Sequence, residues 1–245
     1  MNNLTSLRTP WLAGLITVLL WLVAAPVWAD GFQVEPFDAH YTVKLDGFKV
    51  GELQQRLSKQ NDGTSLLETI MYTTGLVHWF KSDKVVEQSV MRQVDDTLQP
   101  LAYSYRYTGR NKDVVERIDF DWKKGQVSSL RDGQITILPT EKGLLDNQLY
   151  QLLVRRDLAR GLKKMSYRVA YRSRITSVDI TVQGEETVTT PFGKYRAIKV
   201  SRGATTLWCA PDLGYTVVKL AREEDDHTAI SYITSLTRNG VTLGE

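Results

Sequence analysis

The sequence is short of the residues from which disulfides and metal sites are built. It contains one cysteine, Cys209, so no disulfide can form within the chain. A lone cysteine is most often a small buried hydrophobe, and we expect that role here. The three histidines, His40, His78 and His227, lie far apart along the chain and share no ligand spacing. We therefore expect neither a bound metal nor a cofactor.

Sequence signals of two common function classes are also missing. The chain has no G-x-S-x-G, S-x-x-K or H-E-x-x-H motif and no glycine-rich phosphate loop, so these routes to catalysis are not indicated. Its formal net charge is only +3, from 31 Lys and Arg residues against 28 Asp and Glu residues. A nucleic-acid binder would show a far stronger basic excess. We therefore predict a protein that is not an enzyme and does not bind nucleic acid.

Long hydrophobic runs are scarce, and the longest lies near the N-terminus, from Trp11 to Val23. A basic residue precedes this run and small residues lead from it to Ala29, which is typical of a secretory signal peptide cleaved after Ala29. The alternative is an uncleaved membrane anchor, but the run and its flank barely reach the roughly 20 residues that span a bilayer. We therefore expect a signal peptide at residues 1–29, followed by one soluble β-rich domain at residues 30–245 that does not span the membrane.

The mature part of the chain shows one long helical signal, from Gly143 to Lys164. Asp146 is placed to cap this helix, and Gly161 is placed to end it. Leu149, Leu152 and Leu153 fall on one side, so the helix should bury that side against a sheet.

Short strands account for almost all of the remaining mature chain. Residues 37–46 illustrate the pattern, because apolar and polar side chains alternate cleanly there. Turn residues separate successive strands, which predicts an antiparallel meander. With more than about ten strands, such a sheet should curl. The predicted fold is therefore mainly β, with a large curved antiparallel sheet, a half-barrel or open barrel, wrapped around one α-helix.

Five short motifs, in order along the chain, resemble signatures of one family, the secreted bacterial proteins known as domain of unknown function 3108. They are Gln99 to Tyr103 (QPLAY), Phe120 to Trp122 (FDW), Leu145 to Leu149 (LDNQL), Glu186 to Val200 (ETVTTPFGKYRAIKV) and Leu207 to Leu220 (LWCAPDLGYTVVKL). The resemblance implies a periplasmic protein of the cell envelope and no established reaction. The expected architecture also resembles that of periplasmic lipoprotein carriers, in which a curved sheet holds an apolar ligand on its concave side.

A cluster of bulky side chains stands where a polar turn would be expected between two strands. The segment Gly75 to Lys81 reads GLVHWFK. An exposed apolar surface of this kind marks a ligand rim, a partner surface or a membrane contact, whereas the alternative is a continued strand buried against the helix. The ligand-binding residues predicted from it are Leu76, Val77, Trp79 and Phe80.

Basic residues accumulate between Arg155 and Arg174, where eight lysines and arginines accompany one acid. Those in the helix offset its dipole. Arg168, Arg172 and Arg174 alternate with apolar residues, which predicts that they share one face of a strand. That face could contact an anionic surface such as lipid headgroups or an acidic partner, and a merely soluble outer face is the alternative.

These patterns lead to two functional hypotheses. The first is a non-enzymatic periplasmic binding protein that holds an apolar or lipid-like ligand, such as an acyl chain, in the concave face of the sheet. The alternative is a protein-interaction component of envelope assembly or stress signalling, recognised through its outer face or sheet edges. An open pocket would favour the first, and a concavity packed solid by the helix leucines the second.

Overall fold

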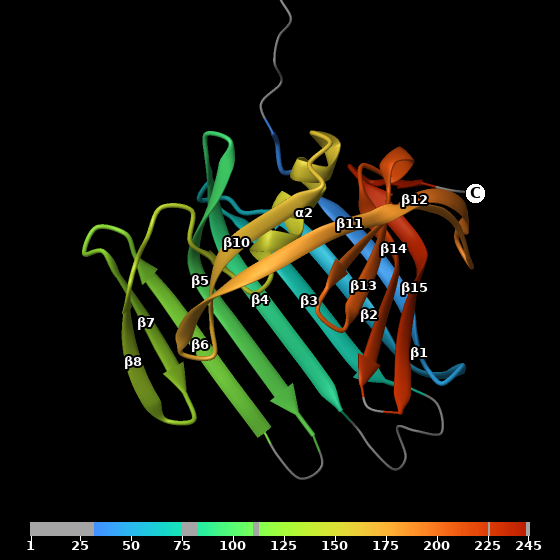
Figure 1. Cartoon of the computed structure of the whole chain (residues 1–245). Coiled ribbons are helices and arrows are strands. Elements are labelled where there is room, and N and C mark those ends of the chain that lie inside the picture. The colour runs from blue at the N-terminus through green and yellow to red at the C-terminus, as the bar shows by residue number, and fades with distance from the viewer. Residues whose placement is uncertain (1–31, 75–82, 110–112, 225, 244–245) are drawn as a thin grey trace, which may run out of the picture. The chain divides into compact units, whose positions relative to one another are not determined.

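We analysed a computed structural model of the chain, which describes residues 32–74, 83–109, 113–224 and 226–243 (Figure 1). Residues from Gly31 onward form one compact unit. Its strands are β1 (Phe37–Leu45), β2 (Phe48–Lys59), β3 (Ser65–Thr73), β4 (Lys84–Val94), β5 (Thr97–Thr108), β6 (Asp113–Asp121), β7 (Gln126–Arg131), β8 (Gln134–Pro139), β9 (Leu145–Asp146), β10 (Lys164–Tyr171), β11 (Arg174–Thr190), β12 (Gly193–Arg202), β13 (Thr205–Ala210), β14 (Thr216–Glu224), β15 (His227–Arg238) and β16 (Val241–Leu243). The helical elements are α2 (Leu149–Ala159) and the 3₁₀ turn η1 (Pro211–Leu213).

All the strands of the described residues belong to one 16-stranded sheet, and nearly every neighbour in it is also a neighbour in sequence. β1 to β8 form one antiparallel meander, and β10 to β15 form a second. β1 pairs with β15 and joins the two, while the short β9 pairs in parallel with β10. Among the described strands β8 and β9 do not pair with each other, so the sheet stays open. The predicted curved antiparallel sheet is confirmed, in its open form.

The hairpin of β10 and β11 crosses the concave side of the sheet in front of β4 to β6 (Figure 1). Ala170 of β10 packs in a cluster with Tyr103 and Ile118 of the opposite wall. The hydroxyl groups of Ser129 on β7 and Ser173 in the hairpin turn lie 3.1 Å apart. The two edges of the sheet are therefore held together by side chains instead of by a strand ladder.

Helix α2 lies inside the concavity, as the sequence predicts, although it is shorter than the predicted range. Asp146 precedes it in β9, and its Oδ1 accepts hydrogen bonds from the backbone N–H groups of Gln148 (2.9 Å) and Leu149 (3.0 Å). Gly161 has φ +78° and ends the helix, with its N–H donating to the Leu158 carbonyl. Both predicted boundaries of the helix are thus set by the residues that the sequence indicates.

The apolar side of α2 forms the centre of the main core. Its buried leucines, Leu149, Leu152, Leu153 and Leu158, are between 0% and 4% exposed. They pack in one cluster with side chains from the concave faces of both meanders, including Phe37, Leu57, Val200 and Leu236. The helix therefore fills one half of the concavity and supplies the contact between the two walls.

A row of polar side chains crosses the same concave face beside this core. Residues paired in register from β2 to β7 form it, and we refer to them as the polar row: Gln55, Thr69, Glu87, Tyr105, Glu116 and Arg131. Two residues away along the strands, the corresponding row contains Leu57, Leu67 and Tyr103, which are buried. The concave face thus changes from apolar to polar over one repeat of the pleat.

Truncating a buried leucine of α2 tests how strongly the helix stabilises the core. We predict that Leu149→Ala lowers the free energy of unfolding by about 2–5 kcal/mol, because the substitution leaves a cavity at a fully buried position. Phe48→Ala is the matched control, since Phe48 is 78% exposed and its truncation should cost less than about 0.5 kcal/mol. Urea unfolding measures both. Equal losses would contradict this assignment.

The polar row also predicts how stability depends on pH. Burial, followed by the negative charge of Asp146, raises the pKa of Glu87 from 4.5 to about 7. Burial likewise raises the pKa of Asp146 from 3.8 to about 6. Because the unfolded chain ionises these groups at lower pH, the folded protein binds more protons in the intervening range. Stability should therefore fall as pH rises from about 4 to 7.

We predict that Glu87→Gln raises the melting temperature at pH 8, where the wild-type carboxylate is charged and buried, and leaves it near the wild-type value at pH 4.5. Each kcal/mol gained should appear as about 2–4 °C in a domain of this size. Thermal unfolding followed by circular dichroism at the two pH values measures the effect. A variant less stable than the wild type at pH 8 would show that the carboxylate is stabilised in the fold.

Candidate ligand-binding site

The apolar residues predicted to bind ligand, Leu76, Val77, Trp79 and Phe80, lie outside the described residues. Their role remains a prediction. Met71 of β3 lies on the concave face and is 39% exposed. The described part of the chain therefore does contain an open apolar position on this side of the sheet.

The three arginines predicted to share one strand face do not do so. Arg168 lies on β10 and forms an ion pair with Glu141 at 2.6 Å. Arg172 lies in the turn after β10 with φ +51°, and its guanidinium is 5.0 Å from the ring centre of Tyr171. Arg174 is the first residue of β11. The sequence alternation continues through a tight hairpin turn, so the shared strand face was a wrong inference, and contact with an anionic surface stays a prediction.

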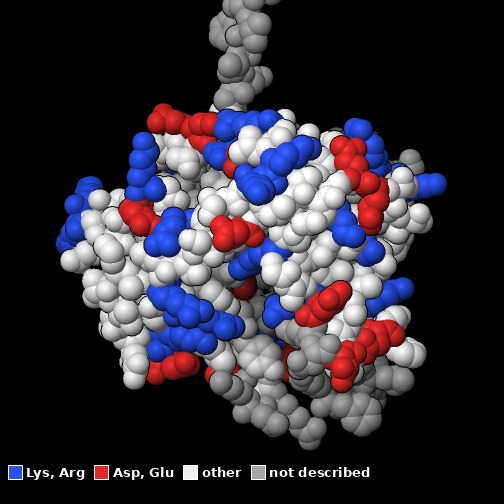
Figure 2. Space-filling view, viewed as in Figure 1, with Lys and Arg blue, Asp and Glu red and all other residues white. Residues whose placement is uncertain are grey.

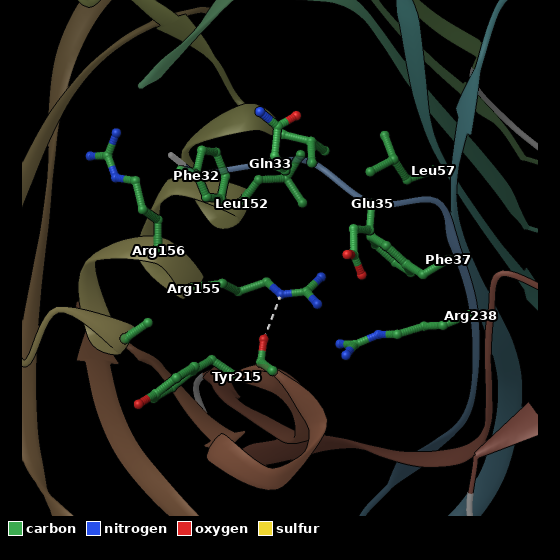
Figure 3. Close-up of a pocket in the computed structure, with 13 residues that line it drawn as sticks. Phe32, Gln33, Glu35, Phe37, Leu57, Leu152, Arg155, Arg156, Tyr215 and Arg238 are labelled. Atoms are coloured by element: carbon green, nitrogen blue, oxygen red, sulfur yellow. Dashed lines mark hydrogen bonds between the residues drawn. The ribbon is translucent and has the colours of Figure 1, made fainter. Parts of the chain in front are cut away.

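The structure instead contains a pocket at the end of the concavity beside the C-terminal half of α2, which we call the arginine pocket (Figure 3). It has a volume of about 280 Å³, near the lower limit for small-molecule sites. It is enclosed by α2, by the strands that open and close the sheet at β1 and β15, and by the chain segment before β1. Its lining residues include Phe32, Glu35, Phe37, Leu57, Leu152, Arg155, Tyr215 and Arg238.

Helix α2 places Arg155 at the floor of this pocket. One turn beyond Leu152, its guanidinium donates to the Gly214 carbonyl at 3.2 Å and to the Thr216 hydroxyl at 3.1 Å. It also stacks over the Phe37 ring, 4.9 Å from the ring centre. Burial and the positive charge of Arg238 lower the pKa of Arg155 to about 10, so the guanidinium remains charged at neutral pH.

Arg238, at the end of β15, brings a second guanidinium to the same space. It donates to the Leu213 carbonyl at 2.6 Å and to the Thr216 hydroxyl at 2.8 Å. Burial lowers its pKa as well, and the negative charge of Glu35 opposes this shift. In Figure 3 the side chains of Glu35, Arg155 and Arg238 point toward one another. The pocket therefore concentrates two positive charges against one carboxylate.

The remaining walls of the arginine pocket are apolar. Phe37 and Leu57 come from neighbouring strands and Leu152 from the helix, and all three are less than 5% exposed. Phe32 lies at the rim, with the Arg156 guanidinium 5.7 Å from its ring centre. A guanidinium pair beside an apolar wall can bind a carboxylate or phosphate that carries a hydrocarbon group.

Sequence reasoning missed most of this pocket. Arg155 was attributed to the helix dipole, and Arg238 and Glu35 were not singled out, because they are about 80 and 120 residues distant from it in sequence. A signal was nevertheless present, since Arg155 follows Leu152 by three residues and so lies beside the buried side of the helix. An arginine at such a position has to find partners inside the fold.

Other candidate chemistry is limited in the described residues. They contain no group of three or more His, Cys, Asp and Glu side chains placed to hold a metal ion. The described helices include none that is long and apolar enough to cross a membrane. Cys209 is 1% exposed, and burial raises the pKa of its thiol to about 12, so it is an unreactive core residue, as expected.

Comparisons with known proteins agree with this architecture. The family model described as "Protein of unknown function (DUF3108)" matches residues 37–234. No curated protein matches the chain. The crystal structure of a β-barrel-like protein of domain of unknown function DUF1849 from Brucella abortus superimposes with a TM-score of 0.54 at 10% identity, covering 86% of this chain and 100% of that one. A protein from Parabacteroides distasonis described as a "putative lipoprotein" gives a TM-score of 0.30 at 8% identity, covering 84% and 97%. The first of these shows a shared fold.

Proposed function

The chain belongs to the DUF3108 family, and we propose that this member is a non-enzymatic binding protein of the bacterial cell envelope that holds an amphipathic anion in the arginine pocket. The acidic group lies at Arg155 and Arg238, and the hydrocarbon part lies against Phe37, Leu57 and Leu152. The observation that carries this proposal is the convergence of two half-buried guanidiniums on one apolar pocket.

The charges of the pocket favour an acidic ligand. Thr216 and backbone carbonyls accept hydrogen bonds from both arginines, but they carry no charge to neutralise them. Glu35 supplies the carboxylate that faces the arginines (Figure 3). It belongs to the short segment before β1, so a ligand carboxylate can take its place without disturbing the sheet. Glu35 thus marks the position where an acidic group binds.

The size of the pocket limits the ligand. About 280 Å³ accommodates a headgroup or a short acyl chain, and a longer chain would extend through the open side. Burial of the hydrocarbon part provides about 25 cal/mol for each Å² removed from water, before entropic losses. The N-terminal pattern of the sequence supports export, and we place the mature protein in the periplasm.

A second candidate function is protein interaction during envelope assembly or stress signalling. Two observations favour it. The leucines of α2 fill the adjoining half of the concavity, and the edge strand β8 exposes Ile135 (68%) and Ile137 (57%). Exposed apolar edge strands are suited to pairing with another chain. On this alternative, Ile135→Lys together with Ile137→Lys abolishes partner binding and leaves ligand uptake unchanged.

The experiment that tests the leading proposal is native mass spectrometry of the protein purified without added lipid, followed by extraction and identification of any bound molecule. A stoichiometric acid with an acyl chain supports it. A ligand-free mass that does not change when decanoate is offered would rule it out.

Two substitutions in the pocket should have opposite effects on decanoate binding. We predict that Arg238→Gln weakens binding about tenfold or more, because a hydrogen bond to a charged group contributes about 1.5–3 kcal/mol. Glu35→Gln should strengthen binding several-fold, because it removes the competing carboxylate. Isothermal titration calorimetry measures both.

Arg196→Gln is the matched control for the lost charge, since Arg196 is exposed on β12 and pairs with Glu185. It should leave the dissociation constant unchanged. If Arg238→Gln and Glu35→Gln also bind decanoate with the affinity of the wild type, the acid binds outside the arginine pocket.

A further inference from the structure

Strand β8 is the outermost strand of the first meander, and its outer edge is open (Figure 1). Among the described strands it pairs only with β7. The other end of the sheet is different, because both residues of β9, Leu145 and Asp146, are 0% exposed. On β8, by contrast, the side chains of Ile135 and Ile137 are both more than half exposed. One end of the sheet is thus enclosed, whereas the other presents an apolar strand to its surroundings.

The hairpin turn before β8 determines which of its backbone groups face outward. Asp132 and Gly133 form this two-residue turn, with φ of 49° and 79°, so the residues on either side of it are a hydrogen-bonded pair. The alternation of an antiparallel ladder then directs the backbone of Thr136 toward β7, and it directs the backbones of Ile135 and Ile137 away from it. No backbone group elsewhere in the described chain hydrogen-bonds to these two residues. Their N–H and carbonyl groups can therefore pair with another strand.

β8 lacks most of the features by which natural edge strands avoid pairing. Its sequence, QITILP, contains no charged residue, and its register with β7 contains no bulge. Only Pro139, at its last position, limits further pairing. In Figure 2 the left margin of the molecule, where Figure 1 places β8, is largely free of charged atoms, and charged side chains stand toward its two ends. An edge strand of this kind is suited to accept another strand.

The strand matches a second copy of itself in antiparallel order. When Thr136 lies opposite Thr136 of the second copy, Ile135 of each copy lies opposite Ile137 of the other. Each of these isoleucine pairs then exchanges both of its backbone hydrogen bonds, because the backbones of Ile135 and Ile137 are the ones that face outward. The isoleucine side chains of both copies meet on the outer face of the sheet, and the Thr136 side chains meet on the concave face. Cross-strand pairs of both kinds stabilise a sheet.

The charges beside β8 fit the same register. Asp132, whose side chain is 64% exposed, precedes the strand, and the exposed Lys142 follows it. Antiparallel pairing centred on Thr136 brings Asp132 of one copy toward Lys142 of the other at each end of the contact. Opposite charges therefore meet at both ends, and the uncharged strands bring no like charges together between them. This complementarity of β8 to itself favours a second copy of the chain as the partner.

From this arrangement we propose that β8 is a dimerisation edge, which pairs with β8 of a second copy about a two-fold axis at Thr136 and joins the two sheets into one. A two-fold contact uses the same strand on both copies, so it stops at a dimer and forms no filament. The proposal deepens the second candidate function by naming the partner at β8. It does not depend on the arginine pocket, which lies at the far end of this meander, beside β1 and β15.

The small size of the contact sets its strength. β8 contributes six residues from each copy, whereas a standard stable interface uses about 20–30 residues a side. We therefore expect a weak dimer, with a dissociation constant in the micromolar range, that forms and separates as the protein concentration changes.

The test is sedimentation velocity of the mature protein from about 1 µM to about 1 mM, which covers this range of affinity. We expect a monomer at the lowest concentration and a dimer at the highest. Ile135→Lys together with Ile137→Lys should leave a monomer throughout, because like charges then lie opposite each other. Phe48→Lys is the matched control, since it adds the same charge at an exposed apolar position on β2, and it should dimerise as the wild type does. Melting temperatures near that of the wild type show that each variant is folded.

A mixture of complementary variants identifies the partner as a second copy. Ile135→Glu together with Ile137→Glu should also be monomeric alone. An equimolar mixture of this variant with the lysine variant should form a dimer at the concentrations where each alone does not, because opposite charges then face each other across the contact.

Amide hydrogen exchange locates the contact on the strand. The amides of Ile135 and Ile137 should exchange rapidly in dilute protein and slowly in concentrated protein, whereas the amide of Thr136, which faces β7, should exchange slowly in both. A wild type that stays monomeric at about 1 mM, a lysine variant that still dimerises, or Ile135 and Ile137 amides that exchange rapidly in the dimer would each overturn the proposal. Decanoate binding by a monomer would retain the leading function while rejecting the dimer.

Discussion

The carboxylate of Asp146 is the contact on which the rest of the molecule depends. It is fully buried, and its Oδ1 accepts three hydrogen bonds, two from the backbone at the start of α2 and one from Ser89 of β4 at 2.9 Å. These bonds satisfy N–H groups that a helix start leaves unpaired, and they tie the helix to the opposite wall of the sheet. One side chain thus fixes both where α2 begins and how deep it lies in the concavity.

The position of α2 then determines what the concavity contains. Its leucines close the centre. The C-terminal half of the helix carries Arg155 into the arginine pocket, where Arg238 and Glu35 meet it. The N-terminal end places Asp146 and Gln148 in the buried interior of the sheet. Because charged groups are costly to bury without partners, the position of the helix determines where each of these side chains must find its partners.

Much of the fold could be predicted from local patterns. The alternation in residues 37–45 and the turn residues between successive strands gave the antiparallel meander, and Asp146 and Gly161 indicated both ends of the helix. β7 carries a weak sequence signal because Ser128 and Ser129 do not alternate in hydrophobicity, although Ser129 is fully buried. β9 is two residues long and exists only because β10 lies alongside it. Such elements are created by tertiary contact and carry little signal of their own.

The sites were less predictable than the fold, for a physical reason. A pocket depends on which distant residues the topology brings together, and Glu35, Arg155 and Arg238 come from the first strand region, the helix and β15. The polar row is similar, because six strands each contribute one residue that appears ordinary in its own strand. Arg172 shows the opposite failure, since its alternation with apolar neighbours continued through a turn where the strand had already ended.

The measurement that tests the central claim most directly is a crystal structure of the protein grown with decanoate. The account predicts a carboxylate within hydrogen-bonding distance of Arg155 and Arg238, with Glu35 displaced and the chain against Phe37, Leu57 and Leu152. Crystals in which decanoate is bound elsewhere, and in which Glu35 still faces both arginines, would contradict it.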